Sequence, residues 1–406
     1  MKRFFSFLAM SAIVLTMASC GGNDANDPEL NTKYFTIEVT VGEAVANEPL
    51  KMHIKITPTD DVKRYVLYLN TKSKAEENGC LTLDGLMAYC KEENYDIIMA
   101  NSRYNSGTPW EFDQRFDYDA ESIIILFAVD ENKEPIADSW TTKTFRTPIE
   151  PIAVNGMMPG AFTVDVLGTQ VHFSQGNLQY NAASNTWQFA TNQWDTIGAA
   201  NKNIAADYDG WIDLFGWNTA DKPTLASDKT EDYPQSPFKD WGKNTIANGG
   251  NQTWKTLSKD EWNYLFILRA KADKLFGFGS VAGVNGLILL PDDWKMPEGV
   301  PEFAPSLTKG LEWSSWMYYN SNNDNFKHNT YTAKEWYKME KAGAIFLPAA
   351  GYRSGTDMYN VGVECFYWTS AAKNEYRAYC LGLNSCALLP ENDAYLDCGQ
   401  SVRLVH

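Results

Sequence analysis

The sequence predicts a multidomain protein, with an N-terminal all-β sandwich that carries a helical insertion and a C-terminal α+β domain. Three observations lead to this fold class. Short segments of alternating hydrophobicity fill residues 34–148, and a proline-containing stretch, residues 149–160, follows them. Beyond it the composition changes, because twelve of the 14 tryptophans follow residue 155. A chain of 406 residues also has the length of two or three domains.

Composition limits the partners that this protein can bind. The formal net charge is −16, hydrophobic residues make up 44% of the chain and aromatic residues 14%. This apolar content is enough for packed cores. The negative charge argues against nucleic acid as a partner, because phosphate binding needs a basic surface. It also argues against electrostatic attraction to anionic lipid.

Residues 1–19 have the pattern of a secretory signal peptide. Lys2 and Arg3 precede an apolar run that is too short for a good membrane span. The stretch "MASCGG" resembles a bacterial lipobox, although Met17 stands where leucine is commoner. The resemblance implies that Cys20 is lipidated; a plain secretory signal with a chance cysteine is the alternative.

Residues 20–33 are predicted to form a flexible, acidic tether. They resemble the export tethers of bacterial surface lipoproteins, which implies a lipid-anchored protein on the outer face of the outer membrane. This compartment is oxidising, so it permits disulfide bonds.

The first domain is predicted from four strand-like stretches. Residues 34–41, 50–58 and 64–70 alternate between apolar and polar side chains, as half-buried strands do. Residues 122–148 read as a strand, an Asp-Glu-Asn turn and a second strand. Strands at intervals of about ten residues are typical of a sandwich over residues 34–148.

A helical insertion is predicted within this sandwich. Residues 81–100 place Leu86, Met87 and Cys90 on one helical face. The strand spacing and the exit "TFRT" resemble fibronectin type III-like modules of surface lipoproteins. This resemblance implies an immunoglobulin/fibronectin III-like domain that holds another domain away from the membrane.

The second domain, residues 161–406, is predicted to contain two helices and a few strands. Each helix begins with a capping box, Ser258 with Glu261 and Thr332 with Glu335. The first helix is expected over "KDEWNYLFILRAKA" and the second over "TAKEWYKMEKAG", where Gly343 ends the helix. Strands are expected in "VHFSQGNLQY" and "TWQFA", and long loops pinned by buried tryptophans make up much of the rest.

The sequence carries no catalytic motif, and no catalytic, metal-binding or cofactor-binding residue is predicted. The four histidines lack metal-ligand spacing, and His172 is expected to be solvent-facing or hydrogen-bonded. The glycine-rich stretch "GFGSVAGVNG" follows a helix, so it reads as a turn and not as a dinucleotide loop. Asp292 and Asp293 could ligate calcium, but a helix cap or turn is the simpler interpretation.

Four cysteines near the end of the chain leave three interpretations open. Cys365, Cys380, Cys386 and Cys398 contain no C-x-x-C spacing, which disfavours zinc. They could form disulfides in three connectivities, and Cys80 with Cys90 could form another. The third interpretation is that some of these cysteines are incidental.

Seven stretches in the second half carry a family resemblance: "VHFSQGNLQYNAASNTWQFA", "YDGWIDLFGWNT", "WKTLSKDEWNYLF", "VNGLILLPDDW", "AGAIFLPAAGYRSGT", "FYWTS" and "SVRLV". In this order they resemble the C-type-lectin-like domains of bacterial surface lipoproteins, related to the variable proteins of diversity-generating retroelements and more distantly to formylglycine-generating enzymes. The resemblance implies that the last strand, "QSVRLV", pairs near "VHFSQ". It also implies that four tryptophans belong to the scaffold: Trp211, Trp217, Trp294 and Trp368.

In retroelement variable proteins the stretch before the last strand is the binding surface, and adenines in its codons are mutated. Residue types that asparagine codons can become are dense here, whereas Glu364, Glu375 and Glu391 do not fit and would be fixed. The resemblance therefore implies a ligand-binding site made of Tyr359, Val363, Cys365, Phe366, Tyr376, Arg377, Cys380, Asn384, Ser385, Cys386, Asn392, Asp393, Tyr395, Asp397 and Cys398.

Charge indicates which partners this segment prefers. From Glu364 to Cys398 two basic residues face five acidic ones, so neutral or basic partners are favoured. The first hypothesis is a surface adhesion or binding protein that holds a protein or glycan ligand through residues 357–398. A glycan-capture lipoprotein of a polysaccharide-uptake system is the alternative. A formylglycine-generating-like enzyme that binds copper through cysteines such as Cys380, Cys386 or Cys398 is a weaker one.

Overall fold

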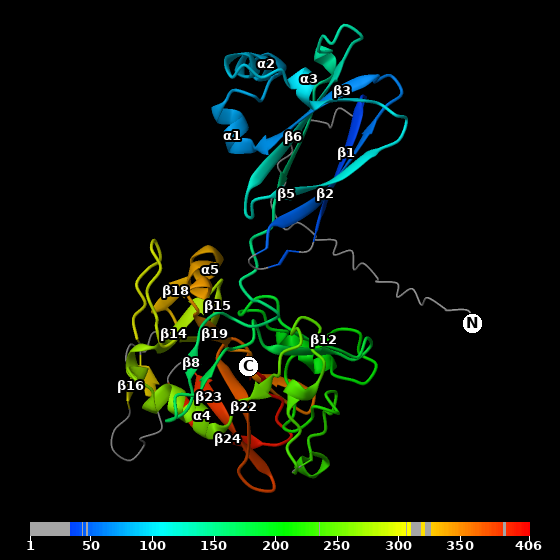
Figure 1. The fold of residues 1–406 in the computed structure, drawn as a ribbon. Helices are drawn as coiled ribbons and strands as arrows, with labels where there is room; N and C mark the ends of the chain where they lie inside the picture. The colour runs from blue at the N-terminus through cyan, green and yellow to red at the C-terminus, as the bar shows by residue number, and fades with distance from the viewer. Residues whose placement is uncertain are drawn as a thin grey trace, which may run out of the picture. The chain divides into compact units, whose positions relative to one another are not determined.

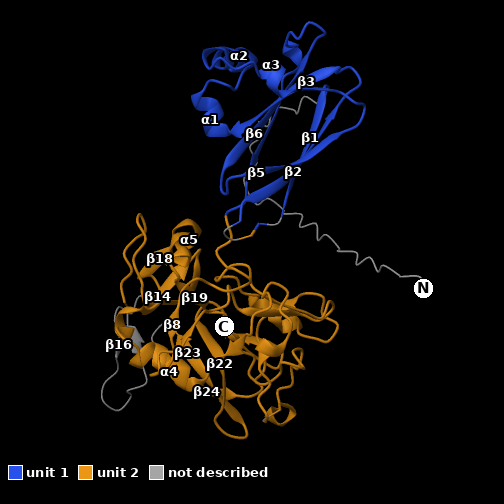
Figure 2. Ribbon diagram, viewed as in Figure 1, with its two compact units in different colours: residues 1–44, 48–149 blue, residues 45–47, 150–406 orange. Residues whose placement is uncertain are grey.

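The computed structural model describes residues 33–42, 44–45, 48–234, 236–305, 307–309, 318–320, 326–384 and 387–406. The predicted signal peptide and the lipidation site Cys20 lie outside these residues. The chain divides into two compact units, residues 1–44 with 48–149 and residues 45–47 with 150–406 (Figure 2). No helix in the described part of the chain is long and apolar enough to cross a membrane.

Unit 1 contains two antiparallel sheets (Figure 1). The first has the strand order β1-β2-β5, made of β1 (Phe35–Val41), β2 (Leu50–Pro58) and β5 (Trp110–Phe116). The second has the order β4-β3-β6-β7, made of β4 (Ser102–Tyr104), β3 (Arg64–Thr71), β6 (Glu121–Val129) and β7 (Thr141–Arg146). A short 3-10 helix, η1 (Ala137–Ser139), precedes β7.

Strand β6 explains how this unit is layered. Its side chains are almost all apolar, as expected of a strand that is covered on both faces. Ile124 and Leu126 lie in a core shared with the first sheet, whereas Ile125 and Phe127 lie in a second core. Three helices supply the other side of that second core: α1 (Lys72–Glu77), α2 (Leu83–Glu92) and α3 (Ile97–Asn101).

The strands and the helix predicted for unit 1 are present in the structure. The three alternating stretches correspond to β1, β2 and β3, and helix α2 buries Leu86 and Cys90 as expected. Strand β5 was missed because charged side chains occupy its exposed face, and α1 because Ala75 is its one buried residue. The possible disulfide is not formed, since Cys80 and Cys90 are both free thiols.

Unit 2 is built around two larger antiparallel sheets, the second of which includes one parallel pairing. The first has the order β16-β17-β24-β23-β22, made of β16 (Leu307–Lys309), β17 (Tyr318–Asn320), β24 (Ala387–Tyr395), β23 (Arg377–Asn384) and β22 (Glu364–Ala372). The second has the order β18-β14-β15-β19, made of β18 (Asn329–Tyr331), β14 (Phe276–Val281), β15 (Val284–Leu289) and β19 (Ile345–Pro348).

Shorter elements complete unit 2. Three two-stranded sheets are made of β8 (Phe162–Thr163) with β9 (Gln170–Val171), β13 (Lys255–Thr256) with β25 (Leu404–Val405), and β20 (Tyr352–Ser354) with β21 (Asp357–Tyr359). A three-stranded sheet has the order β11 (Thr186–Phe189), β10 (Leu178–Asn181) and β12 (Trp211–Ile212). The 3-10 helices are η2 (Gly198–Asn203), η3 (Thr230–Asp232), η4 (Trp241–Lys243) and η6 (Ala272–Lys274). The predicted linker is part of this unit, because Met158 is buried in its core.

Both predicted capping boxes are present in the structure. Helix α5 (Ala333–Lys341) begins at Thr332, and Gly343 follows it at a φ of +95°. Helix α4 (Lys259–Asn263) begins at Ser258, but it passes after one turn into a π-helix, η5 (Tyr264–Leu268). The α-helix is therefore shorter than the sequence predicts.

The end of the chain pairs beside the start of the predicted domain. Val405 bridges Phe173, and the backbone amides of His172 and His406 donate to each other's carbonyl oxygens at 3.0 and 2.9 Å. The expected pairing of "QSVRLV" near "VHFSQ" is thus observed. Its regular strand is short, because residues 400–401 make single bridges to other segments.

Two of the four expected scaffold tryptophans are fully buried and hydrogen-bonded. The indole nitrogen of Trp217 donates to the Thr369 carbonyl at 2.9 Å, and that of Trp368 donates to the Phe215 carbonyl at 2.7 Å. Trp211 and Trp294 are only partly buried. The central tryptophans therefore tie loops to the β22 strand.

Candidate functional site

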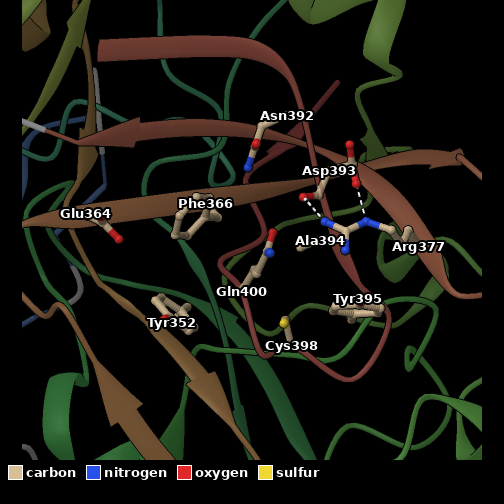
Figure 3. Close-up of a pocket in the computed structure, with 10 residues that line it drawn as sticks. All are labelled: Tyr352, Glu364, Phe366, Arg377, Asn392, Asp393, Ala394, Tyr395, Cys398 and Gln400. Carbon is tan, nitrogen blue, oxygen red and sulfur yellow. Dashed lines mark hydrogen bonds and ion pairs between the residues drawn. The ribbon is translucent and has the colours of Figure 1, made fainter. Parts of the chain in front are cut away.

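A pocket of about 240 Å³ lies over the sheet formed by β22, β23 and β24 (Figure 3). Most of the side chains that line it come from these strands, and the rest come from β20 and from residues 398–400, a segment that we call the strap. The lining residues are Tyr352, Glu364, Phe366, Arg377, Asn392, Asp393, Ala394, Tyr395, Cys398 and Gln400.

The strap, residues 398–400, is held against the fold by its backbone. Gly399 exchanges two hydrogen bonds with Arg353, at 2.9 and 2.8 Å, and Gln400 exchanges two with Phe215, each at 2.9 Å. A Cβ atom on Gly399 would lie 2.8 Å from the Nε of Arg353, so a larger residue does not fit here. This close approach places Cys398 and Gln400 at the pocket.

A glycine also makes room on the sheet. A Cβ atom on Gly382 would lie 2.9 Å from the amide nitrogen of Asn392. That nitrogen donates to the sulfur of Cys380 at 3.4 Å. The pairing of β23 with β24 shifts register between Cys380 and Gly382, and the shift lies next to Asn392.

At one end of the pocket, the cation Arg377 is paired with the carboxylate of Asp393. Asp393 accepts from Lys373 at 2.5 Å and also from the Nε of Arg377. Burial opposes ionisation of Asp393, but hydrogen bonds from Lys373 and Arg377 outweigh it and hold the pKa of this carboxyl below its ordinary value. The guanidinium of Arg377 lies 4.3 Å from the ring centroid of Tyr395. Its charge is therefore shared between a carboxylate and an aromatic face.

The other end is aromatic and acidic. The rings of Tyr352 and Phe366 meet edge to face at 5.6 Å, and Tyr359 stacks on Tyr352 at 5.2 Å. Burial raises the pKa of the Tyr352 hydroxyl, so this group stays neutral at physiological pH. Glu364 accepts a hydrogen bond of 2.7 Å from Asn360.

Gln400 lies at the centre of the lined surface (Figure 3). It is 1% exposed. Its Oε1 atom has no hydrogen-bond partner. A buried acceptor without a partner is uncommon and carries a desolvation cost, which suits a position where a ligand can donate.

The pocket thiol is not set up as a nucleophile. Burial raises the pKa of Cys398 to about 11 and that of Cys380 to about 12. Both groups are therefore protonated at neutral pH, whereas nucleophilic cysteines act as thiolates. The described cysteines are all free, so none of them forms the disulfides that the sequence left open.

The structure separates the predicted site residues into groups. Six line the pocket: Phe366, Arg377, Asn392, Asp393, Tyr395 and Cys398. Tyr359, Val363 and Tyr376 are exposed outside it, and Asn384 is partly exposed at the end of β23. Ser385 and Cys386 lie outside the described residues.

Three predicted site residues are buried and do not line the pocket. Cys365 and Cys380 are 0% exposed, and they pack in two different hydrophobic cores. Asp397 is 8% exposed and accepts a hydrogen bond from Thr230. These residues were selected for their codon type, which does not report the direction of a side chain.

Four pocket residues lie outside the predicted site: Tyr352, Glu364, Ala394 and Gln400. Glu364 was set aside because its codon did not fit, and Gln400 was assigned to the closing strand. Tyr352 precedes the predicted segment and reaches the pocket through the β20–β21 hairpin. The alternation of side chains along β22 was the one local signal for Glu364, since Glu364 and Phe366 share a face.

Asp292 and Asp293 lie in a turn, as predicted, and the side chain of Asp292 also has a structural role. It accepts from the backbone nitrogen and hydroxyl of Thr163 at 2.8 and 2.6 Å, and it pairs with Arg269 at 3.2 Å. Burial lowers the pKa of Arg269 to about 10, and Asp292 offsets part of this effect.

His172 lies 3.2 Å from the Met158 carbonyl oxygen, so it is hydrogen-bonded as predicted. Within the described part of the chain, no three histidine, cysteine or acidic side chains are grouped to hold a metal ion.

The chain matches none of the protein-family models, curated proteins or solved structures with which it was compared. What the pocket can bind therefore follows from its own side chains.

Proposed function

We propose that this protein is a cell-surface lipoprotein whose C-terminal unit binds a protein or glycan ligand. In this proposal residues 357–398 supply a binding surface diversified by a retroelement, on a C-type-lectin-like scaffold. Lipidation of Cys20 anchors the protein to the outer membrane, and the N-terminal sandwich holds the binding unit away from the lipid. The proposal includes no cofactor and no catalytic step.

The observation that carries this proposal is a group of exposed apolar side chains beside the pocket. Val361 and four of the predicted site residues are between 42% and 51% exposed: Tyr359, Val363, Tyr376 and Tyr395. Exposed apolar side chains that gather near a pocket are typical of an interaction surface. Tyrosine in particular gives large contact area at low entropic cost, as in antibody loops.

The architecture of each unit supports its proposed role. In unit 1, sheets of three and four strands in the orders β1-β2-β5 and β4-β3-β6-β7 match a fibronectin III-like sandwich with a helical insertion between β3 and β4. In unit 2, pairing of the closing segment with Phe173 agrees with a lectin-like domain. The exposed residues lie between two well-packed parts, so they can vary without loss of the core.

The binding surface can be tested with a fourfold variant that replaces Tyr359, Val363, Tyr376 and Tyr395 by serine. We expect this variant to lose the ligand that the native protein captures from a displayed protein library or a glycan array. Because these side chains are exposed, the melting temperature should change by only about 2–4 °C. A variant that unfolds, or that still binds fully, would contradict the proposal.

Retroelement diversification has a separate test in the source genome. We expect a reverse transcriptase gene nearby and a near-copy of the segment that encodes residues 357–406. Its mismatches should fall at adenines, and they should be concentrated at codons of exposed residues such as Tyr376 and Tyr395. The absence of such a copy would remove this part of the proposal and leave the binding surface standing.

A glycan-capture lipoprotein is the second candidate, and one observation favours it. Aromatic rings from Tyr352, Phe366 and Tyr395 lie beside the amides of Asn392 and Gln400, which is a combination that sugars use for stacking and hydrogen bonds. Binding on the glycan array without binding in the protein library would favour this candidate. A formylglycine-generating-like enzyme has less support, because Cys380 is fully buried.

A further inference from the structure

The pocket is elongated along β23, which separates its two charged ends. Glu364 pairs with Asn384 across β22 and β23, and Arg377 pairs with Tyr395 across β23 and β24. Asn384 and Arg377 are seven residues apart on β23, so the ends are about 20 Å apart at 3.3 Å per residue. This distance exceeds the Debye length of about 8 Å at physiological salt, so each end acts on a ligand separately.

The two ends of the pocket differ in how their charged groups are paired. At the Arg377 end, Asp393 forms ion pairs with both Lys373 and Arg377, so one carboxylate faces two cations. At the other end, Glu364 accepts from a neutral amide, that of Asn360, and forms no ion pair within the described part of the chain. Glu364 is therefore the carboxylate of the pocket that lacks a cationic partner in the described part of the chain, and it disfavours an anionic group at its own end.

The surroundings of Glu364 suit an ammonium group on an alkyl chain. Phe366 is two residues further along β22 on the same face, about 7 Å away, and its ring meets that of Tyr352 edge to face. Aromatic rings beside a carboxylate attract a cation through both the ring quadrupole and the charge. The same rings offer apolar contact to methylene groups.

At the centre of the pocket, the side-chain oxygen of Gln400 can accept a hydrogen bond from a ligand. Gln400 lines this pocket, is 1% exposed, and leaves its Oε1 without a partner. A backbone N–H of an extended peptide can donate to this atom while a lysine side chain reaches toward Glu364. A length of about 20 Å accommodates roughly six extended residues, which favours a peptide over a compact ligand.

We infer that the pocket binds an extended segment of a protein partner, with a lysine ammonium at Glu364 and a backbone donor at Gln400. This inference rests on the proposed binding function and names the ligand chemistry of the same site. The exposed tyrosines and valines beside the pocket then contact the rest of the partner. A neutral glycan is the competing occupant, and it would use the same rings without the charge of Glu364.

The test measures dissociation constants of the full chain for two blocked pentapeptides by ligand-observed NMR. One peptide has lysine between pairs of alanines, and the other has norleucine in place of lysine. We expect the lysine peptide to bind about fivefold more tightly at low salt, which is the size of effect that a partly exposed charge pair gives. In Glu364→Gln, which preserves the shape of the side chain, this difference should disappear.

Two further variants complete the design. Gln400→Leu should weaken both peptides to the same extent, because it removes the acceptor for the backbone and not the charge. Glu375→Gln is the matched control, since Glu375 is exposed and does not line the pocket. Each variant is accepted only if its melting temperature remains near that of the native protein.

Several outcomes would overturn the inference. Equal binding of the two peptides would show that the pocket has no preference for lysine. If Glu375→Gln loses the preference for the lysine peptide as fully as Glu364→Gln does, the preference comes from general electrostatic attraction. Displacement of the lysine peptide by a neutral oligosaccharide with higher affinity would identify a glycan site and keep the proposed function. If neither peptide binds while the fourfold serine variant still loses its captured ligand, the inference fails and the proposed function stands.

Discussion

At the scale of single residues, Gly399 connects the core of unit 2 to its pocket. The fully buried Arg353 lies where a Cβ atom on Gly399 would be, and the two residues share two backbone hydrogen bonds. The side chains on either side of this glycine, Cys398 and Gln400, both line the pocket. A change at Gly399 should therefore affect stability and binding together.

We predict that Gly399→Ala lowers the free energy of unfolding by about 2–4 kcal/mol, because the strap must move away from Arg353. Urea denaturation measures this change. Gly362→Ala is the comparison: Gly362 has a φ of +79° but open space around it, so backbone strain alone should cost about 1 kcal/mol. Equal costs for the two variants would contradict the role given to Arg353.

A second residue, Glu340, makes stability depend on pH. Burial raises the pKa of Glu340 to about 7, from an ordinary value of 4.5. Between these values the folded protein holds a proton that the unfolded chain releases, so stability falls as pH rises through this window and levels off above it. Asp213, whose pKa burial raises to about 6, acts in the same direction.

We predict that Glu340→Gln is more stable than the native protein at pH 8, by about 1–3 kcal/mol, and equally stable near pH 4. Urea denaturation at pH 4, 6 and 8 measures the difference. Glu298→Gln, at an exposed position, should show no such trend. A variant at residue 340 that is less stable at pH 8 would mean that the native carboxylate is compensated in the fold.

At the scale of elements, local signals in the sequence predicted local structure. Both capping boxes depend on residues three positions apart, so Ser258 with Glu261 and Thr332 with Glu335 could be read directly. The apolar run of β6 indicated a strand, although the helices that cover its second face could not be paired with it from sequence alone. The π-helix after Asn263 had no signal of its own, because packing of Leu265 and Phe266 in the core decides it.

The pocket could be predicted only in part, for the same reason. Asn392, Asp393 and Tyr395 line it as expected from their place before the closing strand, but Tyr352 and Gln400 arrive from other elements through long-range pairing. Which side chains of β22 and β23 point outward depends on register, and a shift between Cys380 and Gly382 changes it. Codon type therefore selected six residues that line the pocket and three that are buried.

We predict that Thr332→Ala lowers the free energy of unfolding by about 1 kcal/mol, because the backbone nitrogen of Glu335 loses its acceptor at 3.3 Å. Thermal denaturation followed by circular dichroism measures the effect. Thr330→Ala, on the neighbouring strand and also exposed, should change stability by less than about 0.5 kcal/mol. Equal effects of the two substitutions would show that the cap contributes little.

At the scale of the whole molecule, each unit has hydrophobic cores of its own. Unit 1 contains the two cores on either side of β6, and unit 2 contains three others. Multidomain chains with separate cores commonly unfold in more than one step. The two units should therefore respond separately to substitutions in their cores.

We predict two calorimetric transitions for the full chain. Ile125→Ala, in unit 1, should lower one transition, and Leu347→Ala, in unit 2, should lower the other, each through a loss of about 2–5 kcal/mol. Ligand binding in the pocket should raise only the transition that Leu347→Ala lowers. A single transition that moves with both substitutions would show that the units unfold together.

The pairing of residues 404–406 with residues 172–174 also has a consequence for protein synthesis. Residues 400–405 are translated after residues 357–398, yet they complete a core that begins near Phe173. A frameshift or stop codon within residues 357–398 therefore also removes the segment that closes the domain. A folded unit 2 then reports that the reading frame upstream is intact, and under the proposed function misfolding keeps faulty variants from being displayed.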